Sequence, residues 1–280
     1  MSTTKHSTRV AILDSGSLAI DGHKLWWNSG PAGDVRFPVY CVLIEHDDGL
    51  FMFDTGFDLD IGNKFMPIDY PEQKDSQKID AQLALLGYKP SDVTHVLNSH
   101  FHYDHVGFNK HLGHATFMCH EKEFEEGRNP QSFSRGYCDL VWAPQLDRTG
   151  YDSDNVRLRR SHWKGVEAPS DRPKPRIELL TGDVEVVPGV WMIETRGHSA
   201  GHYSCLIEMK ERPSMLFAMD ACYTTRNLEE FTASGIHYDP VMALKSLTKL
   251  KSMRAAGAEL FVSHEYESFN SWRKAPEWYE

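Results

Sequence analysis

Short apolar runs, separated by glycine, asparagine, aspartate and proline, recur along most of the 280-residue chain. Runs rich in β-branched and aromatic side chains predict buried β-strands. We expect such strands at residues 10–13, 39–45, 50–54, 93–97, 115–119, 184–187, 190–194, 205–209, 215–219 and 260–264. The sequence Asp47-Asp48-Gly49 predicts a tight hairpin turn between the second and third strands, because an Asp-Gly pair tolerates the backbone that such turns require.

Helices are indicated where apolar residues lie three or four positions apart. This spacing covers Ile79, Leu83 and Leu86 in one segment and Leu244, Leu247, Leu250 and Met253 in another. Gly87 is a candidate C-cap for the first helix, and Gly257 ends the second. Asp239-Pro240 predicts the start of the second helix, with Asp239 as N-cap and Pro240 in the first turn. A short helix is expected over 120–126, and the whole pattern predicts a mixed α/β fold.

The segment His100-Phe101-His102-Tyr103-Asp104-His105 concentrates four potential metal ligands within six residues. On an extended segment, His100 and His102 point the same way, so both can reach one metal ion. Asp104 and His105 continue the run and can reach a second ion. Neutral imidazole and carboxylate ligands suit zinc, and also iron or manganese.

Three further candidate ligands each follow an apolar, strand-like run: His198, Asp220 and His264. Buried strands therefore deliver these side chains at their carboxyl ends, where active sites commonly form. A carboxylate such as Asp220 can bridge two cations and fix their spacing. Two adjacent ions sharing one water molecule are typical of hydrolases. The sequence thus predicts a hydrolase with two divalent metal ions, zinc above all.

These residues, together with Phe53-Asp54-Thr55-Gly56, resemble the metallo-β-lactamase superfamily over essentially the whole chain. The resemblance implies an αββα sandwich and a single domain spanning residues 1–280, with a lid or insertion at 142–175. It also implies that His100, His102 and His198 hold one metal ion and that Asp104, His105 and His264 hold the other. Asp220 is then the bridging ligand, and Asp54 supports the ligands without binding metal.

Within this superfamily the chain is most similar to lactonases. Asp220-Ala221-Cys222-Tyr223 and residues 197–202 resemble N-acyl homoserine lactonases, and residues 27–31, 35–40, 98–102 and 236–240 resemble 4-pyridoxolactonases. The resemblance implies opening of a small-molecule lactone to a hydroxy acid. The Tyr223 hydroxyl would stabilise the oxyanion, and Asp104 or Asp220 would carry the proton to the leaving group. The expected substrate contacts are Trp26, Trp27, Arg36 and His237, with Phe101 and Tyr103 as further aromatic wall.

Other reactions use the same ligand set, and the sequence leaves them open. Cyclic amides, cyclic carbamates and thioesters are hydrolysed by the same attack, and phosphodiesterases also use this ligand set. A mono-iron oxygenase would need only one metal ion. A non-catalytic metal-binding protein would need no open cleft beside a bridging carboxylate.

Composition narrows the class of partner. The formal charge of −10 and a pI near 5.8 argue against nucleic acid, which requires a basic face. No apolar stretch approaches the roughly 18–20 residues that cross a membrane, and the first residues lack the apolar region of a secretion signal. Five scattered cysteines without a CxxC pair predict reduced thiols in a cytoplasmic protein. The oligomeric state stays undetermined.

Overall fold

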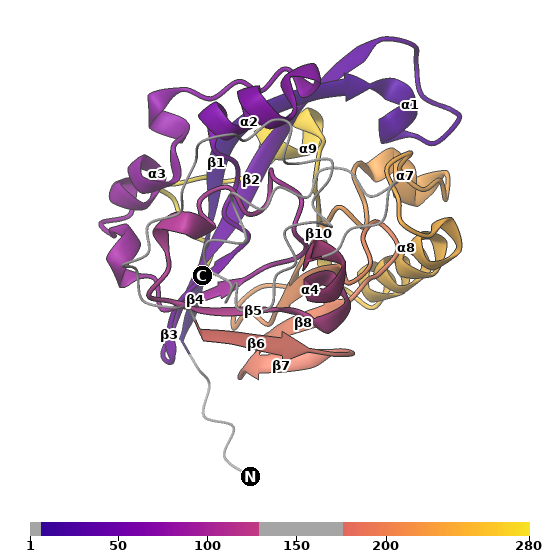
Figure 1. Cartoon of the computed structure of the whole chain (residues 1–280). Helices are drawn as coiled ribbons and strands as arrows, with labels where there is room; N and C mark the ends of the chain where they lie inside the picture. The colour runs from indigo at the N-terminus through magenta and orange to yellow at the C-terminus, as the bar shows by residue number, and fades with distance from the viewer. Residues whose placement is uncertain (1–6, 129–175) are drawn as a thin grey trace.

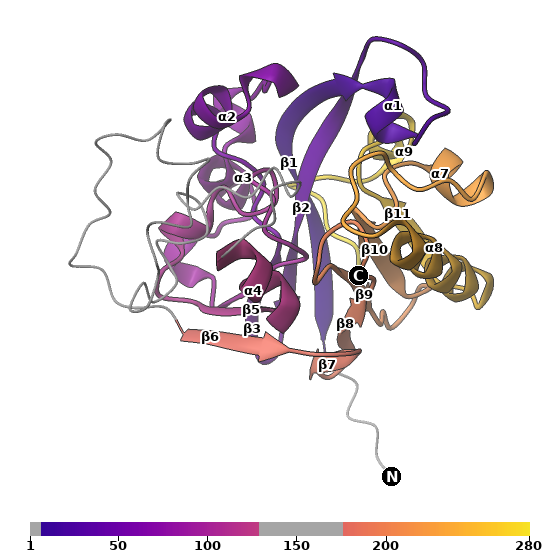
Figure 2. The same ribbon diagram turned by 45° about the vertical axis from the view of Figure 1, so that its right-hand side comes forward.

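The computed structural model describes residues 7–128 and 176–280, which form two β-sheets packed face to face with helices on both outer sides (Figures 1 and 2). Within these residues the first sheet has the strand order β1-β2-β3-β4-β5-β6, and the second has the order β11-β10-β9-β8-β7. This layering confirms the αββα sandwich. The proposed lid at 142–175 lies outside the described residues, as does Cys138.

The first sheet comprises β1 (Thr8–Asp21), β2 (Asp34–His46), β3 (Gly49–Phe53), β4 (His95–Leu97), β5 (Thr116–His120) and β6 (Arg176–Leu180). The second comprises β7 (Val184–Val187), β8 (Val190–Glu194), β9 (Tyr203–Ile207), β10 (Met215–Met219) and β11 (Glu259–Val262). The pairs from β1 to β3 are antiparallel, whereas those from β3 to β6, and the pair β10–β11, are parallel.

The helices are α1 (Gly22–Leu25), α2 (Leu59–Phe65), α3 (Ile79–Leu85), α4 (Glu121–Arg128), α7 (Thr225–Glu229), α8 (Pro240–Ala255) and α9 (Tyr266–Ser271). Short 3-10 turns lie at Pro67–Asp69, Asp75–Gln77, Pro90–Asp92 and Asn109–His111. The predicted cap of α8 is confirmed, because the Asp239 side chain accepts hydrogen bonds from the backbone N–H groups of Val241 and Met242. Among the described residues, no helix has the length and apolar character that crossing a bilayer requires.

The main core lies between the two sheets. Successive side chains of a strand point to opposite faces, so in β1 Val10 and Ile12 join the core between the sheets while Ala11 and Leu13 join the outer layer. There, α3 covers the first sheet, and on the other side α8 covers β10 through Leu247 and Leu250. Because both faces of each sheet are covered, the strands read as apolar runs rather than as alternating ones.

Several predicted boundaries were wrong, most of all in β1. The strand was expected over 10–13 but continues to Asp21. Its polar segment Ser15-Gly16-Ser17 resembles a turn, yet the structure uses it as a bulge with a register shift between Asp14 and Gly16. Gly16 has φ of 107°, and a Cβ there would lie 2.4 Å from Glu72 O, so glycine is required.

The strand β6 was not expected at all. One ligand-bearing strand ends earlier than expected, because β11 stops at Val262 and His264 lies in the loop after it. Cys41, Cys119, Cys205 and Cys222 are buried and not disulfide-bonded.

Candidate metal centre

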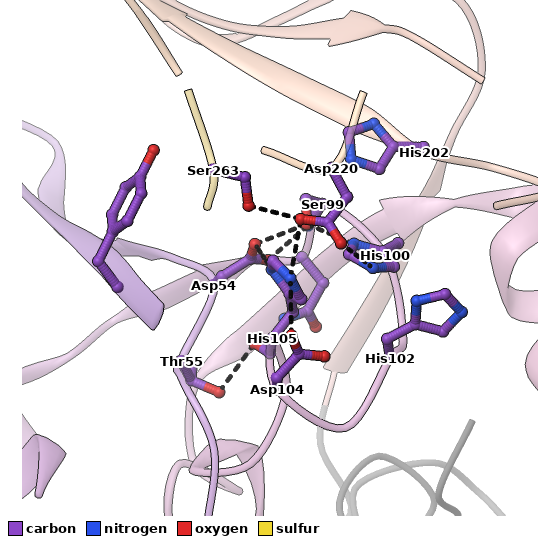
Figure 3. A network of polar contacts seen from close by, with 12 residues as sticks. Asp54, Thr55, Ser99, His100, His102, Asp104, His105, His202, Asp220 and Ser263 are labelled. Atoms are coloured by element: carbon purple, nitrogen blue, oxygen red, sulfur yellow. Dashed lines mark hydrogen bonds and ion pairs between the residues drawn. The ribbon is translucent and has the colours of Figure 1, made fainter. Parts of the chain in front are cut away.

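The candidate ligands gather at one end of the sandwich, in loops that follow β4, β8, β10 and β11. Figure 3 shows His100, His102, Asp104, His105 and Asp220 converging from loops of both sheets. All seven candidate ligands are buried, although most sit in loops. Segments far apart in sequence are therefore brought together by the packing of the two sheets.

The donor atoms fall into two groups. The members of each group lie within 4.8 Å of one another: His100, His102, His198 and Asp220 in the first group, and Asp104, His105 and His264 in the second. The resemblance in sequence implies the same division of the other six residues, with Asp220 as a bridge between the two groups. In the first group, His198 Nε2 lies only 3.0 Å from His102 Nδ1, so two imidazole nitrogens face one point.

Asp220 lies between the two groups and faces both. Its Oδ2 is 3.2 Å from His198 Nε2 and 3.7 Å from His100 Nε2. Its Oδ1 is 3.1 Å from both His105 Nε2 and His264 Nε2. Each carboxylate oxygen therefore points to a different group of imidazoles. This is the arrangement that a carboxylate bridging two cations requires.

The chemistry of these side chains fits two divalent ions. The Nε2 atoms of His100 and His105 are buried, and neither makes a hydrogen bond of good geometry, which is costly unless something else satisfies them. Burial lowers the pKa of His100 and of His198 well below the ordinary value, and it lowers the pKa of His102 to about 4. These imidazoles are therefore neutral at neutral pH, as metal ligands must be.

Hydrogen bonds behind the ligands hold each ring in place. Asp54 Oδ2 lies 2.7 Å from His105 Nδ1, and Asp54 also accepts bonds from the backbone N–H and the hydroxyl of Ser99. His198 Nδ1 contacts Ile236 O at 2.9 Å, and His264 Nδ1 contacts Pro38 O at 3.1 Å. A carbonyl only accepts, so Nδ1 carries the proton in the last two rings and Nε2 is left to bind metal.

Glu123 is a supporting residue that the sequence did not reveal. It lies on α4, is fully buried, and accepts bonds from Phe101 N (2.9 Å), Ser199 Oγ (2.7 Å) and Gly201 N (2.8 Å). One carboxylate thus ties the first ligand loop to the loop that carries His198. No motif marks this residue, because in sequence it is one of several glutamates in a charged helix.

Two contacts hold the loop around His198 in place. Arg196 Nε donates to Ala200 O at 2.6 Å and closes the turn. Gly197 has φ of 128°, and a Cβ there would lie 2.1 Å from Ala243 N, at the start of α8. The glycine therefore allows α8 to approach the ligand loop closely.

A cavity of about 370 Å³ opens over the two groups. It is lined by His102, Asp104, Asp220 and His264 from the candidate centre, and by Tyr103, Tyr223 and His237 among the other residues singled out in the sequence. The ring of Tyr223 lies 5.6 Å from that of His198 and 4.8 Å from that of His264, measured between centroids. Burial raises the pKa of Tyr223 well above its ordinary value, so the phenol is protonated.

Four residues that the sequence predicted to contact the substrate do not line this cavity, namely Trp26, Trp27, Arg36 and Phe101. Arg36 is held by Glu72 at 2.9 Å, Ser17 Oγ and Tyr70 O, so its guanidinium is already paired. Trp26 donates to Thr224 Oγ1 at 2.8 Å. Trp27 is 40% exposed and packs edge-on against His237, whose ring does reach the cavity.

The comparisons with known proteins agree with this geometry. The family model described as Metallo-beta-lactamase superfamily matches residues 34–262. N-acyl homoserine lactonase AttM of Azorhizobium caulinodans is 26% identical over 97% of this chain and 98% of its own length. N-acyl homoserine lactonase AiiA of Bacillus thuringiensis subsp. kurstaki is 28% identical over 96% and 98%.

Among solved structures, the chain is also similar to lactone hydrolases. An N-acyl homoserine lactone hydrolase with the product N-hexanoyl-L-homoserine bound at its catalytic metal centre superposes with a TM-score of 0.78 at 25% identity. The match covers 97% of this chain and 98% of that protein. The likeness therefore extends over nearly the full length of both chains.

Proposed function

Because the chain belongs to the metallo-β-lactamase superfamily, we propose that it is a lactonase, a metal-dependent hydrolase that opens a cyclic ester to a hydroxy acid. The observation that carries the proposal is the position of Asp220, whose two oxygens face two separate groups of imidazoles at the floor of a small cavity. The two N-acyl homoserine lactonases, at 26% and 28% identity over almost the whole chain, support this assignment.

Seven residues would hold two divalent ions: His100, His102 and His198 for one, Asp104, His105 and His264 for the other, and Asp220 for both. Such ions, when bound, activate water near neutral pH and polarise a carbonyl oxygen. The nitrogen and oxygen donors suit zinc, iron and manganese, and zinc is the metal that we propose.

Tyr223 would stabilise the oxyanion. Its ring contacts one imidazole from each group, His198 and His264, so it lies over the space between them. A protonated phenol there donates a hydrogen bond to the carbonyl oxygen as negative charge develops on it. Such donors contribute most when they are fixed in a site that excludes water.

Asp104 and Asp220 are the carboxylates that can move the proton. Both line the cavity and both are buried. Ring opening turns the leaving ester oxygen into an alkoxide, which must take up the proton that the attacking water releases. A carboxylate within reach of both oxygens transfers it without help from bulk solvent.

The cavity suits a small lactone. A volume of about 370 Å³ lies in the range of small-molecule sites, and Phe37, Tyr103 and Tyr223 supply aromatic surface. A flat heteroaromatic ring packs well against such surface. We therefore propose either a small heteroaromatic lactone such as 4-pyridoxolactone or an N-acyl homoserine lactone as the substrate.

Proton release at constant pH from zinc-loaded protein tests the function. A fused-ring pyridine lactone and an N-acyl homoserine lactone are compared, with a cyclic amide and a thioester in parallel. The proposal predicts release with at least one lactone, its loss on chelation and its return with zinc. Hydrolysis of the amide or thioester without either lactone would overturn the lactonase assignment, and oxygen consumption by an iron-loaded form would indicate an oxygenase.

A further inference from the structure

The wall of the cavity away from the candidate ligands is mostly apolar. Its side chains are Leu18, Ile20, Phe37, Met66, Ile68 and Ile236. Three polar side chains interrupt this wall, namely Lys24, Asp69 and His237. None of these three belongs to either donor group, and the ring-opening step does not use them. Their position on a substrate cavity therefore calls for an explanation.

Asp69 is the least expected of the three. It ends the short turn Pro67–Asp69 and is 6% exposed. Tyr103 Oη donates to Asp69 Oδ2 at 3.1 Å, and in the described part of the chain this is the single hydrogen bond that the carboxylate side chain receives. An ionised carboxylate has room for about four such bonds. The wall therefore presents an acceptor that the protein leaves largely unsatisfied.

Tyr103 connects this acceptor to the candidate metal centre. It stands between His102 and Asp104, and its own ring lines the cavity. Because its hydroxyl binds Asp69, the phenol fixes the carboxylate at a set position relative to the scissile end of the substrate. Burial raises the pKa of Asp69 to about 6, which reflects the cost of keeping this charge without enough donors.

Lys24 and His237 add polarity to the same wall. Lys24 belongs to α1 and makes no ion pair or hydrogen bond through its ammonium group within residues 7–128 and 176–280, while its charge favours ionised Asp69. His237 Nδ1 donates to Ser234 O at 2.8 Å, because a carbonyl oxygen only accepts. Trp27 packs edge-on against the His237 ring, with 4.4 Å between the two ring centroids.

We propose that Asp69, held by Tyr103, determines substrate specificity by accepting a hydrogen bond from a hydroxyl or N–H group on the part of the lactone remote from the scissile ester. The preferred substrate is then a lactone fused to a polar ring that carries such a donor. A purely aliphatic chain would cover the carboxylate without pairing it, which a site of this kind disfavours. The inference rests on the proposed lactonase function.

The test compares three lactones with wild-type protein and Asp69→Asn. One is a fused bicyclic pyridine lactone with a ring hydroxyl, the second is the same compound without the hydroxyl, and the third is N-hexanoyl homoserine lactone. A hydrogen bond to a charged group corresponds to about 10- to 100-fold in kcat/KM. We expect Asp69→Asn to lose this factor on the hydroxylated lactone alone. An equal loss on all three would overturn the assignment.

Asp60→Asn is the matched control, because Asp60 is exposed on the neighbouring α2 and does not line the cavity. It should leave all three rates unchanged. The zinc content and the circular dichroism spectrum of Asp69→Asn should equal those of wild type, which shows that the variant is folded and holds metal.

A binding measurement separates this inference from the proposed function. Calorimetry uses two cyclic ether analogues, with and without the ring hydroxyl, in which a methylene group replaces the lactone carbonyl so that neither can be hydrolysed. The hydroxylated form should bind wild type about 10- to 100-fold more tightly, and Asp69→Asn should show none of this preference. Equal binding of both ethers to wild type would overturn the role of Asp69. Absence of hydrolysis with every lactone would overturn only the proposed function.

Discussion

Asp54 holds His105 from behind, with Oδ2 2.7 Å from Nδ1, so that Nε2 of the same ring faces Asp220 Oδ1 at 3.1 Å. The two carboxylates thus lie on opposite nitrogens of one imidazole. Asp54 is fully buried and has φ of 57°, a left-handed conformation that aspartate and asparagine tolerate better than other residues with a Cβ. Both the backbone conformation and the contacts with His105 and Ser99 therefore favour aspartate at position 54.

Replacing Asp54 by asparagine should weaken metal binding without removing a ligand. Asparagine keeps the backbone conformation but removes the negative charge that orients and polarises His105. Loss of such a supporting group typically lowers metal affinity about 10- to 100-fold. Competition with a chelator measures the affinity. Asp80→Asn, an exposed change in the first turn of α3, is the control. Unchanged zinc affinity in Asp54→Asn would contradict the role assigned to it.

Glu123→Ala should destabilise the fold and loosen both ligand loops. The change leaves the N–H groups of Phe101 and Gly201 buried without their acceptor, which should cost about 3 kcal/mol or more in the free energy of unfolding. Glu125→Ala, on the exposed side of the same helix, should change stability by no more than about 0.5 kcal/mol. Urea unfolding of the two variants tests this prediction. Similar midpoints would mean that Glu123 does not hold the two ligand loops together.

Tyr223→Phe should slow turnover while zinc content stays the same. The variant removes the hydroxyl that donates to the oxyanion, and the loss of one such donor lowers kcat by about 100- to 1000-fold. Tyr266→Phe removes an exposed hydroxyl on α9 and should have no effect. If kcat of Tyr223→Phe equals that of wild type, the tyrosine only packs between the two histidines.

Much of the fold could be predicted from the sequence because its strands are covered on both faces and therefore appear as apolar runs. β3, β7, β8 and β10 begin and end close to their predicted bounds. The full length of β1 could not be predicted, since its bulge at Gly16 depends on Glu72 from a distant segment. β6, with exposed residues such as Leu179, owes its place to pairing with β5.

The candidate ligands could be predicted for a similar reason. They follow recognisable strands, and metal chemistry restricts them to a few residue types. The polar residues Lys24 and Asp69 of the cavity wall could not be predicted, because they carry no motif and reach the cavity from α1 and from the turn Pro67–Asp69. Arg36 was predicted to contact the substrate because arginine suits a carboxylate, but in the structure it forms an ion pair with Glu72 of its own chain.

The pH dependence of the free energy of unfolding should reveal the raised pKa of Asp69. Burial raises its pKa from 3.8 to about 6, so between these values the folded state binds more protons than the unfolded state. Stability due to this group therefore falls as the pH rises through that range, by at most about 3 kcal/mol. Asp69→Asn removes the effect and should gain stability relative to wild type from about pH 4 to about pH 7.

Unfolding midpoints of zinc-loaded wild type and Asp69→Asn across this range provide the check. Comparing two proteins at each pH cancels the loss of metal at low pH, which affects both. A difference that stays constant with pH, as expected for Asp60→Asn, would mean that the carboxylate of Asp69 is not held at a raised pKa.

The central claim is that Asp220 joins two metal ions into one hydrolytic centre. Titrating the metal-free protein with zinc, while the zinc content and the rate of lactone hydrolysis are measured on the same samples, tests this claim directly. The account predicts that the rate rises until about two ions are bound per chain. It also predicts that Asp220→Asn loses both the second ion and the rate. Full activity at about one ion per chain, with Asp220→Asn still active, would contradict it.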